Sequence, residues 1–178
     1  MVVILTKTSK ETMRDDEIKV LNIMEQHAKE NINEIAKKCG LSPQKVTRII
    51  KNLEKEKIIW GYSAIEDGTL RDFKHFVVLA KRNTMPFGDD VRKEIILRKL
   101  DDYPMDIIRI ENIYLTHGVS DWIITFYAPD IQSAKKFVDE TFARFSKYLK
   151  EYNIIETLVS VRKLGFKNPR IKELVEYV

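Results

Sequence analysis

Six polar residues lie close together in the sequence and have side chains that suit contact with nucleic acid: Ser42, Gln44, Lys45, Thr47, Arg48 and Lys51. The two lysines and the arginine carry positive charge that can neutralise phosphates. Gln44 and Arg48 each have two hydrogen-bonding groups, spaced as adenine or guanine edges require in a major groove. This set of side chains predicts a surface that contacts duplex DNA.

Residues 31–57 supply two helices that would present these side chains. Asn31 and Glu34 have the spacing of a capping box, which predicts that a first helix begins here. Gly40 can adopt the left-handed conformation that ends a helix, and Ser42-Pro43 is a typical start for the next one. Two helices joined by a glycine-containing turn predict a helix-turn-helix, whose second helix lies in the major groove.

The second helix is expected to have one apolar side. Val46, Ile50 and Leu53 recur at helical spacing, with Ile49 beside them. This side should pack in a core and leave the basic side exposed. The simpler alternative is a helical hairpin whose basic side faces only water, as the polar side of a surface helix usually does.

Residues before and after this helix pair complete a compact head. Asp15 or Asp16 is expected to cap a leading helix. The packing stripe of that helix would consist of Ile18, Leu21 and Met24. Residues 58–65 are apolar and aromatic, which predicts a strand that forms a wing. The apolar residues 2–5 would form an arm or an added edge strand.

Length and composition indicate a soluble globular protein. The 178 residues suffice for two small domains, and 44% of them are hydrophobic and 33% charged. The net charge of +4 is mild, and the residues up to Asp67 hold 12 basic and 11 acidic side chains, so the basic signal is local to the second helix. Cys39 is the only cysteine, which excludes an internal disulfide and agrees with the reducing cytoplasm. No apolar run predicts a membrane span or a signal peptide.

The second half of the chain alternates strands and helices in the order β-α-β-β-α-β. The expected strands span 73–82, 105–116, 122–127 and 154–164, with helices at 91–100 and from Pro129-Asp130 onward. This order predicts a ferredoxin-like domain, in which two helices cover one face of a four-stranded antiparallel sheet. The polar segment 66–72 is typical of a linker. We therefore expect an α+β chain with a winged helix-turn-helix at 1–66 and a ferredoxin-like domain at 67–178 that ends in a short helix, 169–178.

Several runs of the head resemble the DNA-binding half of the Lrp/AsnC family, the feast/famine transcription regulators. They are Asp16–Leu21, Glu34–Ala36, Gly40–Ser42, Val46, Leu53-Glu54 and Ile58–Tyr62. Farther along, Gly118–Asp121 matches the G-x-x-D turn of the family's ferredoxin-like RAM domain. Lys57 departs from the pattern where the family usually has glycine, and Ile49 where a second arginine often follows Arg48. The resemblance spans nearly all of residues 15–165 and implies a sequence-specific DNA-binding transcription regulator.

The resemblance also implies a small effector, commonly an amino acid, bound near this turn where subunits meet. The residues that match are Thr116, His117, Gly118, Ser120 and Asp121. Gly118 would let a ligand approach the backbone, and Asp121 can pair with an ammonium group. The alternative, which we favour for Asp121, is that its carboxylate satisfies only the amides of the turn.

Assembly follows from the same architecture. An open sheet leaves one face bare, and a two-fold dimer gives a DNA-binding head two half-sites. We expect a homodimer or a higher homo-oligomer, with outward apolar groups of strands 73–82 and 154–164 at its interface. The resemblance further implies that dimers join into tetramers or octamers.

Catalysis is the competing class of function. His27, His75 and His117 fall in three different elements, and the sequence has no metal-ligand or nucleophile motif, so we expect no catalytic residue, metal or cofactor. The enzyme alternative is a siroheme decarboxylase-like protein, because the subunits of that family resemble the same two domains. That family tends to have a His-Asn-Tyr element near the turn between the second and third strands. Here His117 is present, but the Asn-Tyr is not. A third interpretation is an effector-binding or assembly module whose head no longer binds DNA.

Overall fold

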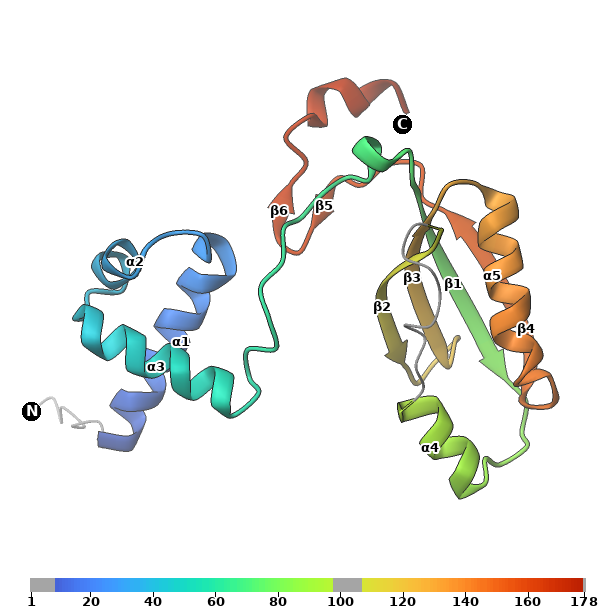
Figure 1. The fold of residues 1–178 in the computed structure, drawn as a ribbon, viewed down its shortest axis with the longest axis horizontal. Coiled ribbons are helices and arrows are strands. Elements are labelled where there is room, and N and C mark those ends of the chain that lie inside the picture. Colours follow the sequence, from blue (N-terminus) through green and yellow to red (C-terminus); the bar gives the residue numbers. More distant parts are fainter. Residues whose placement is uncertain (1–8, 98–106, 178) are drawn as a thin grey trace, which may run out of the picture. The chain divides into compact units, whose positions relative to one another are not determined.

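The computed structural model describes residues 9–97 and 107–177 of the chain (Figure 1). These residues fall into two compact units. The first unit holds the residues up to Ile65 together with Arg162–Lys167, and the second holds Glu66–Val161 and Asn168 onward. The predicted arm at 2–5 and the residues around Pro104 lie outside the described ranges.

The first unit, which we call the head, contains three α-helices: α1 (Ser9–His27), α2 (Ile32–Cys39) and α3 (Pro43–Lys55). The predicted cap at Asp15 or Asp16 is wrong, because α1 is already helical from Ser9 and Asp16 lies buried inside it. Asp16 is tolerated there because Lys45 supplies the opposite charge, at 2.5 Å.

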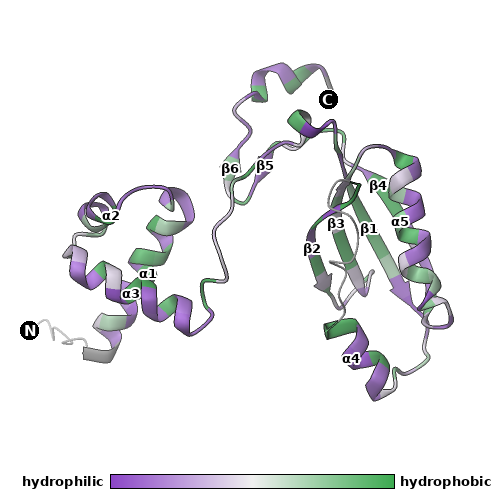
Figure 2. Cartoon of the chain, in the orientation of Figure 1, coloured by the Kyte–Doolittle hydropathy of each residue, from purple (hydrophilic) through white to green (hydrophobic). Residues whose placement is uncertain are grey.

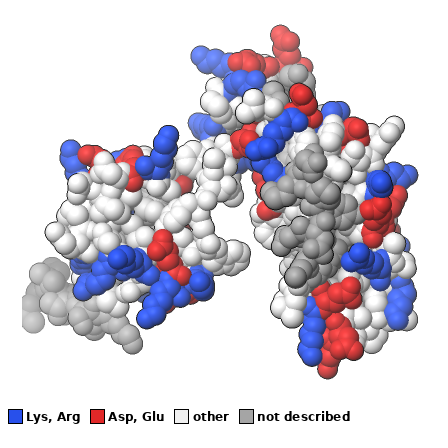
Figure 3. Space-filling model, in the orientation of Figure 1, with Lys and Arg blue, Asp and Glu red and all other residues white. Residues whose placement is uncertain are grey.

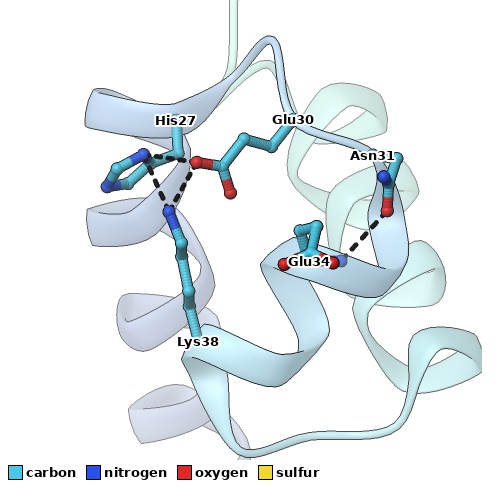
Figure 4. Close-up of polar contacts among 5 residues, drawn as sticks. All are labelled: His27, Glu30, Asn31, Glu34 and Lys38. Carbon is cyan, nitrogen blue, oxygen red and sulfur yellow. Dashed lines mark hydrogen bonds and ion pairs between the residues drawn. The ribbon is translucent and has the colours of Figure 1, made fainter.

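The predicted start of α2 is present. Asn31 is the N-cap, and its side-chain oxygen accepts a hydrogen bond from the Glu34 amide at 3.1 Å (Figure 4). The helix ends at Gly40, whose φ of 65° is the left-handed conformation predicted from its missing Cβ. The amide of Leu41 then donates to the Ala36 carbonyl at 3.0 Å, which completes the helix end.

The third helix begins and ends with defined hydrogen bonds. The hydroxyl oxygen of Ser42 accepts from the Lys45 amide at 3.3 Å, and Pro43 follows as the first helical residue. At the other end the Ile58 amide donates to the Leu53 carbonyl at 2.9 Å. Lys57 between them has a φ of 59°. Lys57 therefore takes the left-handed conformation that glycine would provide, and the turn keeps its geometry.

The head has one apolar core. It consists of Val20, Met24, Ile35, Ala36, Cys39, Val46, Ile49, Ile50 and Leu53. The expected stripe of α1 is partly wrong, since Ile18 is 48% exposed and Val20 is fully buried in its place. Ile49 is only 4% exposed, so this position, often arginine in the resembling family, belongs to the core here.

The predicted wing strand is not formed. Residues 58–65 contain no strand in the described chain, and Trp60 is 94% exposed. β-branched and aromatic residues favour a pleated, half-buried surface, but a strand also needs a neighbour to pair with. The two-stranded element of this unit is instead a hairpin of β5 (Arg162–Lys163) and β6 (Phe166–Lys167). A Cβ on its Gly165 would lie 3.1 Å from the side-chain nitrogen of Gln26, so the hairpin meets α1.

The second unit confirms the βαββαβ prediction. Its elements are β1 (Lys74–Arg82), α4 (Asp89–Leu97), β2 (Arg109–Leu115), β3 (Trp122–Ala128), α5 (Ile131–Ala143) and β4 (Leu149–Glu156). Short 3-10 helices lie at η1 (Thr69–Arg71), η3 (Ser146–Tyr148) and η4 (Ile171–Tyr177). The four strands form an antiparallel sheet in the order β2-β3-β1-β4. Thus α+β is the observed class.

Several boundaries of this unit differ from the prediction. The strand predicted over 105–116 is β2, and the described residues 107 and 108 lie outside it. The helix predicted from residue 91 begins two residues earlier, at Asp89. The last strand of the sheet spans Leu149–Glu156 rather than 154–164, because only these residues pair with β1. The short C-terminal helix, predicted over 169–178, is present as a 3-10 helix that spans Ile171–Tyr177.

Both helices pack on one side of the sheet. Inward side chains of β1 and β3, such as Phe76, Val78 and Phe126, share a core with Phe137 of α5, and Val91 of α4 packs against it. Figure 2 shows apolar residues along the central strands β1 and β3. Successive strand residues alternate between faces, so Val77, Leu79 and Ile123 point to the other, helix-free side of the sheet, where each is only partly buried.

Candidate nucleic-acid interface and effector turn

The exposed side of α3 carries the basic and amide groups predicted to contact DNA. Gln44, Arg48 and Lys51 are all exposed and recur at intervals of four and three residues, so they lie along one side of the helix. The opposite side holds the buried Val46 and Ile50. In Figure 3, Lys and Arg side chains gather along the edge of the head where α3 lies. This surface has the charge and the hydrogen-bonding groups that a nucleic acid requires.

Two of the six candidate residues also support the helix that presents them. Ser42 caps α3 through its hydroxyl oxygen. Thr47 is partly buried, and its hydroxyl donates to the Pro43 carbonyl at 2.9 Å. Both remain at the first turns of α3, where free amides and the helix dipole favour a phosphate.

Lys45 is turned toward α1. Its ammonium group lies 2.5 Å from the carboxylate of Asp16, whose side chain is only 7% exposed. Lys19 of α1 lies 4.0 Å from the other carboxylate oxygen. The sequence prediction grouped Lys45 with the DNA-facing residues, but the structure pairs it with a buried acid 29 positions away.

A second cluster of charges joins α1 to α2 (Figure 4). A carboxylate oxygen of Glu30 lies 2.8 Å from the ring nitrogen of His27 and accepts from the Lys38 ammonium at 2.5 Å. Lys38 also lies 3.0 Å from His27. The hydrogen bond from Lys38 is the main cause that lowers the pKa of Glu30. This cluster, which sequence spacing did not indicate, holds the head together on the side of α2.

The effector candidates lie around the turn between β2 and β3. Asp121 holds this turn to β1: its carboxylate accepts from the Arg82 amide at 2.9 Å and lies 3.1 Å from the Lys81 ammonium, while its own amide donates to Ala80 at 2.9 Å. The hydrogen bond from the Arg82 amide, the largest cause, lowers the pKa of Asp121. These contacts support the reading in which Asp121 stabilises the turn.

The other turn residues have their own local contacts. Thr116 donates its hydroxyl to the Ser120 carbonyl at 2.6 Å, and Lys81 donates to the Gly118 carbonyl at 2.7 Å. Gly118 has a φ of 149°, which an L side chain rarely adopts, and no heavy atom beyond its two neighbours in the chain lies within 4 Å of where its Cβ would be. His117 is exposed. The backbone of Gly118 is therefore open to a small molecule.

The histidines occupy separate sites. His27 lies in the head and His117 on the exposed turn, whereas His75 of β1 bonds Thr157 at 2.7 Å and Glu111 at 3.1 Å. Within the described residues, no three His, Cys, Asp or Glu side chains form a group that can hold a metal ion. Among those same residues, no helix is long and apolar enough to cross a membrane.

Comparison with known sequences agrees with this geometry. Residues 15–59 match the family described as "Winged helix-turn-helix DNA-binding". The chain is 28% identical over 135 residues to the uncharacterised HTH-type transcriptional regulator YugG of Bacillus subtilis, covering 72% of this chain and 75% of that one. It is 26% identical over 128 residues to the leucine-responsive regulatory protein of Haemophilus influenzae, covering 72% and 74%.

Solved structures share the whole architecture. An AsnC family transcriptional regulator from Agrobacterium tumefaciens has a TM-score of 0.64 at 18% identity, covering 86% of this chain and 95% of that one. A transcriptional regulator from Neisseria meningitidis, solved as an L-Met complex, has a TM-score of 0.63 at 16% identity, covering 97% and 100%. These structures show the fold: a helix-turn-helix head followed by a four-stranded antiparallel sheet with helices. The sequence relatives are transcriptional regulators, one of them a leucine-responsive regulatory protein, so the chain is similar in sequence to the kind of protein that the sequence analysis predicted.

Proposed function

We propose that this regulator binds specific DNA sequences by placing α3 in a major groove. Gln44 and Arg48 would read base edges, and Lys51 would contact a phosphate. Ser42 and Thr47, at the start of the helix, would lie against the backbone of the same groove. The observation that carries this proposal is the division of α3 into a buried apolar side and an exposed side with these groups.

The proposal divides the work between the two domains, with residues 1–66 binding DNA and 67–178 responsible for assembly and effector binding. A protein that acts on genomic DNA would work in the cytoplasm, as the single cysteine also suggested. The relatives' names describe transcriptional regulators, and no observation favours the decarboxylase alternative.

The direct test is to select duplexes from a random-sequence library with the full-length protein and to measure their binding by fluorescence anisotropy. We expect a recurring motif, bound at least about 10³-fold more tightly than an unrelated duplex of the same length. Equal binding to both duplexes would remove sequence specificity from the proposal. Failure to bind either duplex at low salt would remove DNA binding itself.

We also propose a two-fold homodimer formed through the helix-free side of the sheet. Val77, Leu79 and Ile123 are partly buried there, and Ile155 and Tyr114 on the outer strands are 46% and 49% exposed. Apolar side chains in one contiguous area favour association with a second copy of the same surface. Such a dimer would bring two heads to two half-sites of one operator.

The effector we propose is an amino acid bound at the turn between β2 and β3, at Thr116, His117, Gly118 and Ser120. Gly118 allows close approach to the backbone, and the amides of the turn suit a carboxylate. A regulator with the same fold was solved with L-Met, which supports this class of ligand. Asp121 would shape the site by holding the turn to β1.

A thermal-shift screen of the twenty amino acids tests this part. A ligand that binds only the folded protein raises its melting temperature in proportion to the logarithm of its concentration. We expect a shift with one or a few amino acids, and Gly118→Val should abolish it. A flat screen at millimolar concentrations would remove the amino acid from the proposal without affecting DNA binding.

A further inference from the structure

The buried carboxylate of Asp16 is unusual within the head. Apart from Thr141, it is the one polar or charged residue that is buried in the described part of the chain, with 5% of its surface exposed. A charge in this setting is retained only when an opposite charge and hydrogen bonds compensate its loss of hydration. Lys45 provides both at 2.5 Å, and its side chain remains 36% exposed.

The pair stands at a defined place between two helices. Asp16 lies one turn before Val20 on α1, and Lys45 directly precedes Val46 on α3; both valines are fully buried in the core. The ion pair thus continues the contact of α1 with α3 beyond the apolar core. It reaches the first turn of α3, where Gln44 stands.

We propose that Asp16 and Lys45 are positioning residues for DNA recognition: their ion pair fixes the first turn of α3 against α1, and Lys45 makes no phosphate contact. This inference rests on the proposed binding of α3 in a major groove. It assigns Lys45 a role different from that of Lys51, although both are basic residues on the same helix. It also gives Asp16, which does not face DNA, a role in specificity.

The physical reason is the geometry that base reading requires. A phosphate contact tolerates small displacements because charge acts over a distance, whereas a bidentate hydrogen bond to a base edge is lost when the helix start shifts. An unfixed first turn would therefore weaken binding to the specific sequence more than binding to any other duplex. This difference separates a positioning role from a simple charge role.

The design of the variants exploits the charge balance of the pair. Asp16→Asn combined with Lys45→Met removes one negative and one positive charge, so the net charge of the head is unchanged. Lys51→Met is the matched control, because it removes an exposed lysine of the same helix. Asp16→Asn alone keeps the shape of the side chain and leaves the Lys45 ammonium unpaired, which provides a conservative second variant.

The experiment measures anisotropy binding of the full-length protein to a duplex selected by the wild type and to an unrelated duplex, over a series of salt concentrations. Circular dichroism verifies folding at the assay temperature. The slope is that of the logarithm of the association constant plotted against the logarithm of the salt concentration. We expect the double variant to keep the wild-type slope. Its ratio of specific to non-specific affinity should fall about three- to tenfold. Lys51→Met should make the slope less steep by about 0.9, the value of one phosphate contact, and should leave the ratio of specific to non-specific affinity unchanged.

The single variant remains informative if the double variant does not fold. In Asp16→Asn, Lys45 no longer has a carboxylate partner and becomes able to contact a phosphate. The slope should therefore become steeper, toward the value for one more phosphate contact. An unchanged slope overturns the inference. A slope that is less steep by about 0.9 in the double variant would show that Lys45 contacts a phosphate. An unchanged ratio of specific to non-specific affinity would show that the pair only stabilises the fold. Wild-type protein that binds neither duplex would instead refute the proposed function, and this inference with it.

Discussion

The exposed side of α3 and the helix-free side of the sheet are built by the same rule but present opposite chemistry. Residues one helical turn apart in α3, such as Val46 and Ile50, pack in the core of the head. Alternate residues of β1, such as Phe76 and Val78, pack in the core of the sheet domain. The residues between them differ. α3 presents polar groups such as Arg48, whereas β1 presents the partly buried Val77 and Leu79.

This difference predicts how solution conditions affect the two contacts that we propose for these surfaces. A basic surface gains affinity by releasing counterions from a polyanion, so salt weakens it steeply. An apolar surface gains affinity by removing area from water, which moderate salt leaves nearly unchanged. DNA binding and dimerisation by this protein should therefore respond differently to ionic strength.

The largest effect is expected from a charge placed on the helix-free side of the sheet. Ile123→Asp would bury a carboxylate without a partner in the proposed interface, and should weaken dimerisation by on the order of 100-fold or more. Sedimentation velocity at micromolar concentration measures this as a change from dimer to monomer. Ile131→Asp, at the start of α5, is the control, because Ile131 is 47% exposed and lies outside this surface. A dimeric Ile123→Asp variant would move the interface elsewhere.

The next effect concerns base reading by α3. Arg48→Ala should cost about 1–3 kcal/mol of binding free energy on the selected duplex if Arg48 contacts a guanine, with a relaxed preference at one base pair. Competition anisotropy with single-base variants of the duplex measures both changes. Arg92→Ala in α4 removes a similar exposed charge from the other domain and should leave affinity unchanged. Equal losses on every duplex would make Arg48 a phosphate contact only.

A smaller effect is expected at the turn between β2 and β3, which Asp121 holds to β1. Asp121→Asn should lower the free energy of unfolding by about 1–2 kcal/mol at neutral pH, because a charge-assisted hydrogen bond to the Arg82 amide is weakened. Urea unfolding measures the loss. Asp90→Asn, on the exposed first turn of α4, is the control.

The same variant predicts a pH dependence. The pKa of Asp121 is lowered in the folded state, so its contribution is fully present above the unfolded-state pKa, about 4. It is lost as the pH falls through the folded-state pKa. The stability difference between wild type and Asp121→Asn should therefore shrink in acid. A difference that stayed constant down to pH 2 would mean that the carboxylate charge is not what stabilises the turn.

The smallest effect concerns the two helix ends in the head. Gly40 and Lys57 both have a left-handed backbone, at φ values of 65° and 59°, but only glycine adopts it without strain. Lys57→Gly should raise the free energy of unfolding by up to about 1 kcal/mol, and Gly40→Ala should lower it by a similar amount. Thermal unfolding of the two variants gives opposite shifts. A destabilised Lys57→Gly would show that the lysine side chain contributes more than its backbone strain costs.

Local signals in the sequence predicted α2, α3 and the order of the sheet domain well. The caps at Asn31 and Ser42 and the break at Gly40 depend on neighbouring residues, and the structure keeps all three. The six DNA-facing candidates followed from residue type and helical period. Four of them, Ser42, Gln44, Arg48 and Lys51, are exposed, whereas Lys45 and Thr47 are partly buried.

Features that depend on distant residues were not predictable in this way. The prediction of a wing strand was wrong because a strand forms only when it pairs with another strand. In the described chain, residues 58–65 form no such pairing. The start of α1 was placed too late because Asp16 resembled a cap, and its partner Lys45 lies 29 positions away. The last strand of the sheet was placed too late because its end is set by pairing with β1.

The central claim is that the exposed side of α3 binds DNA, and its most direct test is the salt dependence of binding to the selected duplex. The logarithm of the association constant should fall linearly with the logarithm of the salt concentration. Lys51→Ala, which removes one proposed phosphate contact, should reduce that slope by about 0.9 while leaving the base preference unchanged. A slope identical to that of the wild type, with unchanged affinity, would contradict the claim and assign DNA binding to another surface.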